Sequence, residues 1–175
     1  MSNRPIGLSA VIVLAALATG CTGLPAGVEP VRGFELERYL GTWHEIARLD
    51  HPFERGLERI TATYTRRDDG GVRVVNRGYE VQNGTWREAE GRAYFIGSPD
   101  VGRLKVSFFG PFYGAYNVMA LDQDGYQWAM ICGPDTDYLW ILAREPTLPE
   151  AVLERLLALA SARGFETGKL IYVEH

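Results

Sequence analysis

The sequence has little of the chemistry that catalytic and metal sites need. Its 175 residues include only three histidines and two cysteines, and the histidines, at positions 44, 51 and 175, are too scattered to suggest a metal cluster. We also find no Ser-His-Asp set, no phosphate-binding loop and no paired catalytic carboxylates. The net charge of -4 provides no basic excess for nucleic acid. We therefore expect a binding protein rather than an enzyme, with no metal, no cofactor and no nucleic-acid partner.

Charge is also scarce at the start of the chain, where Arg4 is the only charged side chain in the first twenty residues. The apolar run from 6 to 18 is too short to span a bilayer comfortably and is typical of a signal peptide. It leads into Leu17-Ala18-Thr19-Gly20-Cys21, which resembles a bacterial lipobox. The resemblance implies cleavage before Cys21 and acylation of that residue, for example by palmitate. The alternative is an ordinary secretory signal followed by a chance cysteine.

The lipobox sets the expected domain organisation. Residues 1–20 are the signal peptide, 21–33 a lipidated tether and 34–175 the folded domain. The glycines and prolines between 22 and 32 predict that this tether is flexible. Thr22 stands where an aspartate would resemble an inner-membrane retention signal, so we expect an outer-membrane lipoprotein with its domain facing the periplasm. Since lipid would occupy Cys21, Cys132 is left alone and we expect no disulfide.

From Gly41 onward, short runs of strand-forming residues alternate with turn signals such as Asp69-Gly70 and Asn83-Gly84. A helix is expected after the last of these runs, with Thr147 and Glu150 as a capping box and Arg163-Gly164 as its stop. Eight consecutive antiparallel strands favour an all-β up-and-down barrel, since closure removes the sheet edges and leaves room for one small ligand. The predicted strands are 41–49, 58–65, 72–79, 86–95, 104–109, 113–121, 126–131 and 138–144, with a short final strand at 170–173.

Three motifs in order carry a family resemblance across residues 34–175. Gly41-Thr42-Trp43 resembles the lipocalin G-x-W signature, Thr136-Asp137-Tyr138 resembles the T-D-Y motif, and Arg144 matches the third motif. The sequence between these motifs is similar to that of the bacterial, apolipoprotein D-like subgroup of the family. The resemblance implies an eight-stranded barrel with its helix packed outside and an interior that stores or transports a fatty acid or lysophospholipid for envelope maintenance. Counting strands places Trp43 and Arg144 at the same end, where they are expected to close the barrel through a cation–π contact.

The ligand is then expected near the opposite, open end, which we call the mouth. For each aromatic residue among the candidates named at the end of this paragraph, simple packing inside the barrel is the alternative role. Arg48, Arg55 and Arg67 are candidates for an anionic head group, although solvated surface arginines are the preferred interpretation. The candidate ligand-binding residues are Phe108, Tyr113, Met119, Tyr138, Trp140 and Tyr64.

Two other functions remain open. Phe53, Phe109, Phe112 and Tyr113 are expected to form an aromatic rim at the mouth, which suits membrane access or a protein interface such as a homodimer. Cys132 is the sharpest enzymatic candidate, as the nucleophile of a lipid-modifying enzyme. No histidine is expected beside it, so a small buried side chain is the better interpretation.

Overall fold

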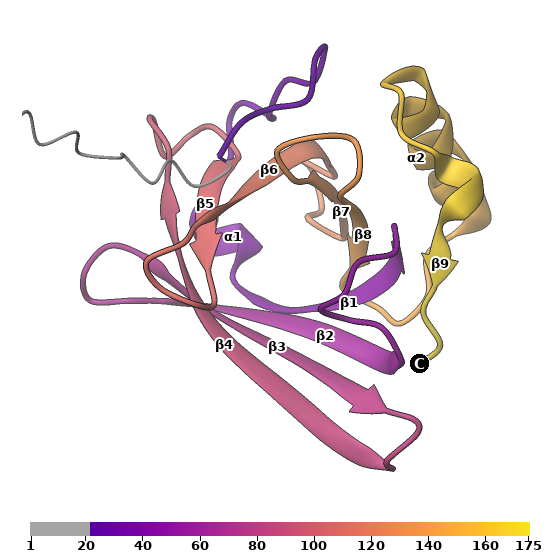
Figure 1. Cartoon of the computed structure of the whole chain (residues 1–175). Coiled ribbons are helices and arrows are strands. Elements are labelled where there is room, and N and C mark those ends of the chain that lie inside the picture. The colour runs from indigo at the N-terminus through magenta and orange to yellow at the C-terminus, as the bar shows by residue number, and fades with distance from the viewer. Residues whose placement is uncertain (1–21) are drawn as a thin grey trace, which may run out of the picture.

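The computed structural model describes residues 22–175, so the predicted signal peptide and Cys21 lie outside the described residues. Most of the chain forms one sheet that curls around a central interior (Figure 1). Every predicted strand is present, with bounds within two residues of those expected. The elements are α1 (Leu36–Tyr39), β1 (Gly41–Arg48), β2 (Leu57–Arg66), β3 (Val72–Glu80), β4 (Thr85–Phe95), β5 (Arg103–Ser107), β6 (Gly114–Leu121), β7 (Trp128–Cys132), β8 (Leu139–Ala143), α2 (Glu150–Ala162), the 3₁₀ turn η1 (Thr167–Lys169) and β9 (Ile171–Tyr172).

The barrel is closed by β1, which pairs with β2 on one side and with β8 on the other. Consecutive strands from β1 to β8 pair antiparallel. The first half of β1 places Trp43 opposite Ala62 of β2, and its second half pairs with β8 and, at Ala47 and Arg48, with the short β9. The expected eight-stranded antiparallel barrel with an external helix is therefore confirmed.

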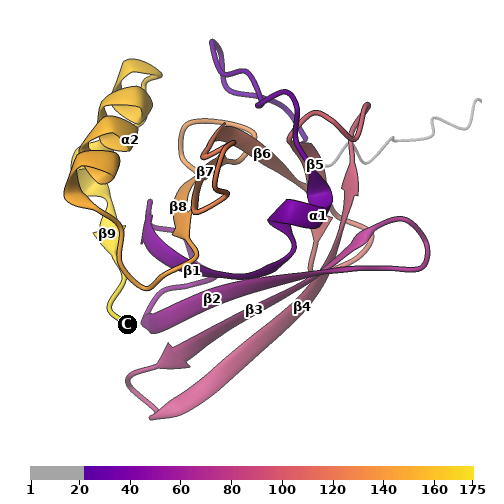
Figure 2. The same cartoon turned by 180° about the vertical axis from the view of Figure 1, so that it is seen from behind.

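Helix α2 lies on the outside of the barrel beside β8 and β9 (Figures 1 and 2). Its Leu156 and Ala160 are buried in an outer apolar cluster with Met130 and Ile141 of the wall. The predicted stop is confirmed, since Arg163 caps the helix and Gly164 has a φ of +86°. The predicted capping box is wrong, because the helix begins after Pro149 and no side chain caps it. Among the described residues, no helix is long and apolar enough to cross a membrane.

The end of the barrel opposite the mouth is sealed by the predicted aromatic and cationic pair. Trp43 is fully buried and its indole Nε1 donates a hydrogen bond to the carbonyl of Tyr39 at 2.8 Å. The guanidinium of Arg144 lies 3.9 Å from the centre of the Trp43 ring. Helix α1 crosses this closed end and is nearest to the viewer in Figure 2. Depth along the barrel can therefore be measured from Trp43 towards the mouth.

The segment from 22 to 33 is packed against the barrel, which corrects the expected flexible tether. Arg103 and the side-chain amide of Asn117 donate hydrogen bonds to the carbonyls of Thr22 and Gly23. Val31 exchanges backbone hydrogen bonds with β6 and with the residue before β5. Glycine and proline content predicted freedom from the chain alone, whereas these contacts come from the folded wall.

Candidate functional site

A layer of tyrosines occupies the barrel interior above Trp43. The hydroxyl of Tyr116 lies 2.6 Å from that of Tyr39 and 2.8 Å from that of Tyr64. Burial raises the pKa of all three phenols above their ordinary value, so they are neutral at physiological pH. Their hydroxyls satisfy one another, which leaves the ring faces as an uncharged floor for whatever enters from the mouth.

An apolar cavity of about 20 Å³ lies against this floor, a volume that holds about one water molecule. Strands β3, β4 and β5 contribute small or branched residues to its wall, and Gly91 of β4 is covered by the ring of Phe108. An acyl chain needs far more room than this cavity provides. The lining residues are Phe34, Leu36, Tyr39, Tyr64, Val72, Val74, Ala93, Leu104, Val106 and Tyr116.

A buried ionic cluster occupies the mouth side of the interior, on the wall formed by β1 and β8. Arg48 Nη1 donates to Glu45 Oε1 at 3.0 Å, and Arg48 Nη2 donates to the backbone carbonyl of Glu54 at 2.9 Å. Glu54 Oε2 lies 2.8 Å from His51 Nε2 and accepts a hydrogen bond from Trp140 Nε1 at 3.2 Å. Glu45, Arg48, His51 and Glu54 are each at most 9% exposed. We call these four residues and Trp140 the mouth cluster.

The two carboxyl groups of the mouth cluster have opposite pKa shifts. Burial and the neighbouring charge of Glu54 raise the pKa of Glu45 well above its ordinary value, despite the ion pair with Arg48. Burial also works against the charged form of Glu54, but contacts with His51, Trp140 and Arg48 outweigh it and lower that pKa. Glu54 therefore holds its negative charge more readily than Glu45 does.

An irregularity in β1 brings Arg48 into the interior. The pairing of β1 with β8 shifts register between Glu45 and Ala47, after which Arg48 stands opposite the inward-facing Trp140. The link from 49 to 56 then folds back over the mouth and adds His51 and Glu54. The sequence analysis named Arg48 and Trp140 as candidates but missed Glu45, His51 and Glu54, because alternation alone does not reveal a bulge. The available signal was Glu45, two residues from Trp43 and so on the same inward row.

Four of the six predicted ligand residues face the interior. Tyr64 belongs to the tyrosine layer, and Phe108 packs against the inner cluster beside Gly91. Tyr138 stacks on Trp140 with ring centres 6.2 Å apart and an interplanar angle of 23°. Both rings lie near His51 of the mouth cluster. These four positions remain our proposed ligand contacts.

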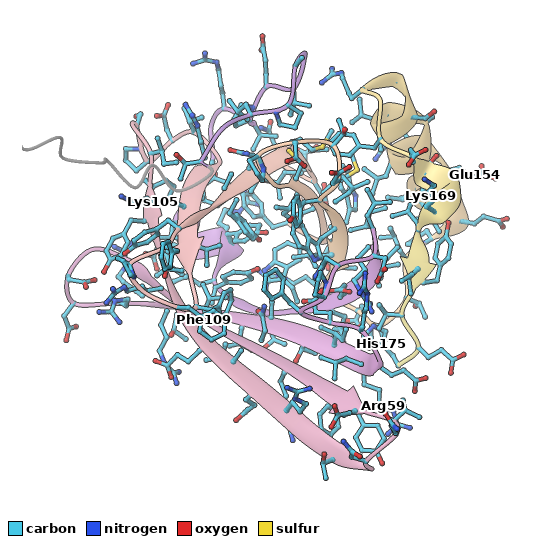
Figure 3. The ribbon with its side chains drawn as sticks, in the orientation of Figure 1. Arg59, Lys105, Phe109, Glu154, Lys169 and His175 are labelled. Atoms are coloured by element: carbon cyan, nitrogen blue, oxygen red, sulfur yellow. The ribbon has the colours of Figure 1, made fainter. Side chains whose placement is uncertain are left out.

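Tyr113 and Met119 lie outside the barrel interior, which corrects the prediction for these two residues. Tyr113 packs against Tyr94, and its ring centre is 4.8 Å from the ammonium nitrogen of Lys105, whose side chain points away from the barrel (Figure 3). Met119 belongs to the outer cluster beneath α2. Val118, one residue earlier, faces inward, as Tyr116 and Leu121 of β6 also do.

Three further predictions concern single side chains. Arg48 is buried in the mouth cluster, so its interpretation as a surface arginine was wrong. Arg55 and Arg67 are paired with Asp50 and Asp69 outside the interior, as expected for surface arginines. Cys132 is fully buried in the outer cluster, where burial raises the pKa of its thiol to about 12. A thiol so strongly protonated is a poor nucleophile.

Three phenylalanines of the predicted rim are exposed. Phe53, Phe109 and Phe112 are 72%, 71% and 67% exposed, on the links that follow β1 and β5. Large apolar side chains that remain this exposed often mark an interaction surface. We call these three residues the rim phenylalanines.

Comparison with known proteins agrees with this architecture. Residues 34–175 match the lipocalin-like domain family. The chain is 53% identical to outer membrane lipoprotein Blc of Escherichia coli (strain K12) over 173 residues, covering 98% of the chain and 97% of the relative. It is 52% identical to the protein of the same name from Vibrio cholerae over 164 residues, covering 94% and 96%. Rat apolipoprotein D is 29% identical over 143 residues, covering 78% and 75%.

Among solved structures, insecticyanin from Manduca sexta has a TM-score of 0.69 at 26% identity, and 87% of each chain is covered. Lobster apocrustacyanin A1, at 16% identity and a TM-score of 0.64 over 87% of this chain and 93% of that one, shares the fold. The chain belongs to the lipocalin family and, like its bacterial relatives, is an outer-membrane lipoprotein and a binding protein rather than an enzyme.

Proposed function

We propose that this lipocalin binds fatty acids or lysophospholipids inside its barrel and stores or transports them for maintenance of the cell envelope. The observation that supports this most directly is the division of the interior into two walls. Strands β3 to β5 provide an apolar wall, and β1 with β8 provides a polar one carrying the mouth cluster. An acyl lipid has the same division into tail and head.

The energetics favour such a ligand. Each methylene that leaves water for the apolar wall contributes about 0.8 kcal/mol before ordering costs. A long chain therefore gains several kcal/mol, enough to offset rearrangement of the side chains at the mouth. Phe108 and Trp140 would flank the chain, and the tyrosine layer would limit how deeply it enters.

The lipid anchor supports a role at the membrane. Lipidation of Cys21 would hold the barrel on the outer membrane, facing the periplasm, because two or more acyl chains anchor a protein stably. Thr22, the next residue, is hydrogen-bonded to Arg103 on the wall of the barrel. The barrel would therefore remain within a few residues of the bilayer that supplies its ligand.

The exposed rim phenylalanines support a second candidate, in which the rim forms a contact between two copies of the chain. A homodimer contact would cover side chains that are otherwise two-thirds exposed or more. This candidate is compatible with lipid binding, since a contact at the rim leaves the interior free.

The test of lipid binding uses the soluble chain that begins at Thr22, which contains every described residue. Native mass spectrometry with lipid extraction identifies any co-purified lipid, and a fluorescent fatty acid measures affinity. Ala93→Phe fills the apolar cavity and is expected to weaken binding about tenfold or more. The control Arg92→Phe changes an exposed position on the outward face of the same strand, opposite Arg73 of β3. An empty chain that takes up no added lipid, or equal affinities for the two variants, would reject the proposal.

A further inference from the structure

The contacts of one carboxylate oxygen suggest what the mouth cluster recognises. Glu54 Oε2 is approached by His51 Nε2 at 2.8 Å, Trp140 Nε1 at 3.2 Å and Arg48 Nε at 3.8 Å. These groups come from the link after β1, from β8 and from β1 itself. Guanidinium, imidazole and indole N–H groups are donors suited to a carboxylate or phosphate oxygen. The arrangement is that of an anion site whose occupant is a residue of the protein.

The occupant is carried by a different kind of element from two of the three donors, whereas His51 lies in the same link as Glu54. Arg48 and Trp140 belong to paired strands, with their Cα positions opposite each other in the β1–β8 ladder. Glu54 lies in the link from 49 to 56, outside any strand. It also retains some exposure to solvent, since its side chain is 11% exposed against 3% for Arg48. A movement of the link removes the carboxylate and leaves the strand donors in place.

Departure of Glu54 leaves buried donors without an acceptor. Arg48 keeps its 3.0 Å ion pair with Glu45, but Trp140 Nε1 loses its acceptor and Arg48 loses both the backbone carbonyl and the nearby carboxylate of Glu54. Buried donors left unpaired are costly, so departure of Glu54 depends on a replacement. An incoming anion would supply the missing acceptor, so opening of the link and binding of an anion are coupled.

The link from 49 to 56 also limits the free volume of the barrel interior. The apolar cavity of about 20 Å³ is lined in part by Tyr64, and Trp140 of the mouth cluster packs against the same inner apolar cluster that contains Tyr64. The mouth cluster and the cavity are therefore neighbours in the interior. Withdrawal of the Glu54 side chain opens space next to the apolar wall at the point where an anion site becomes free.

We propose that Glu54 stands in for the anionic head group of the ligand, and that an acyl lipid displaces it, places its own anionic group on Arg48, His51 and Trp140, and lays its chain along the wall of β3 to β5. This inference rests on the proposed lipid-binding function and adds to it the recognition of the head group. The link from 49 to 56 then opens when the anionic group of the ligand takes the place of the Glu54 carboxylate.

The test separates the head group from the chain by comparing palmitate with methyl palmitate, which has the same chain and no charge. Both compete against a fluorescent fatty acid on the chain beginning at Thr22, and the readout is the ratio of the two affinities. Glu54→Ala removes the internal competitor, so the preference for palmitate over its ester should rise about tenfold, the size of one hydrogen bond to a charged group. Asp50→Asn, an exposed carboxylate on the same link, should leave the ratio unchanged.

A double variant tests the donor side without leaving an unpaired charge. Arg48→Met combined with Glu45→Met replaces the buried ion pair, in which Arg48 Nη1 and Glu45 Oε1 are 3.0 Å apart, with apolar side chains, which proteins tolerate better than loss of one partner. The preference for palmitate should disappear in this variant while methyl palmitate still binds. An unchanged ratio in Glu54→Ala, or full preference for palmitate in the double variant, would overturn the anion site. If neither ligand binds any variant or the unmodified chain, the lipid-binding proposal fails as well.

Discussion

The guanidinium of Arg144 lies 3.9 Å from the centre of the Trp43 ring and also donates hydrogen bonds to the carbonyls of Arg38, Leu40 and Thr42. One side chain from the end of β8 thus fixes both the start of β1 and the segment before it. This contact therefore joins the first and the eighth strands of the barrel at its closed end. Its role is structural, because it lies on the far side of Trp43 from the interior.

Replacement of Arg144 should therefore destabilise the fold. Arg144→Met removes the cation–π contact and four hydrogen bonds to carbonyls, the fourth being that of Tyr126, and we expect a loss of about 2–4 kcal/mol in the free energy of unfolding. Urea denaturation measures this loss. Arg73→Met is the matched control, since the Arg73–Glu90 pair is exposed and solvent-exposed ion pairs contribute little to stability. Similar losses in the two variants would contradict a special role for Arg144.

Trp140 should contribute to ligand affinity more than to stability. Trp140→Ala removes a half-buried ring from the interior and the indole donor from the mouth cluster, so binding of a fluorescent fatty acid should weaken about tenfold or more. Trp86→Ala is the control, because Trp86 is 45% exposed and packs against Tyr79 and Arg77 on the hairpin of β3 and β4. Affinity that is unchanged in Trp140→Ala would remove this residue from the site.

Met119 should contribute to stability and not to ligand affinity, the reverse of Trp140. Its side chain is buried in the outer cluster beneath α2, so Met119→Ala should lower the free energy of unfolding by about 2–4 kcal/mol and leave fatty-acid affinity unchanged. Phe108→Ala, at an inward position, should mainly weaken binding. Parallel urea denaturation and fatty-acid titration of the two variants measure both effects. Loss of affinity in Met119→Ala at a temperature where it is fully folded would contradict its outward placement.

The different fates of Phe108 and Met119 show what the sequence can predict. Turn signals and strand-forming runs placed all eight strands, because those signals act over a few residues. The motif residues Trp43 and Arg144 were paired by counting strand reversals. Inward and outward faces were harder to assign along β6 to β8, because α2 covers their outer face and makes it apolar too. Where both faces are apolar, alternation no longer distinguishes them.

Alternation along the strands could not group the residues of the mouth cluster into one site, for a related reason. Arg48 enters the interior through a register shift after Glu45, and one extra residue reverses every later assignment. His51 and Glu54 lie in a link whose path depends on Arg48 and Trp140 rather than on its own sequence. Local patterns therefore found the barrel and its closed end, whereas the polar part of the site required the packed structure.

The rim phenylalanines allow a test of self-association. If they form a contact between two copies, Phe112→Ser should shift the soluble chain towards monomer in size-exclusion chromatography, because a polar side chain at a 67% exposed position weakens apolar contact. Val81→Ser is a suitable control, since Val81 is also exposed but lies in the link between β3 and β4. An oligomeric state unaffected by Phe112→Ser would argue against this residue as a dimer contact.

Cys132 makes stability depend on alkaline pH with a predictable sign. Its thiol has a pKa of about 12 in the folded chain against an ordinary value of 9.0, because burial disfavours the thiolate. The unfolded chain therefore loses this proton first as pH rises, and stability contributed by the buried thiol is complete below pH 9 and declines between about 9 and 12. Between pH 8 and 10.5 the unmodified chain should lose about 1–2 kcal/mol more than Cys132→Ala. Urea denaturation at the two pH values measures the difference, and equal losses would show that Cys132 titrates normally.

Alkylation of Cys132 provides a second readout, since the chain from Thr22 has this cysteine alone. Iodoacetamide at pH 8 should modify it far more slowly in the folded chain than in urea.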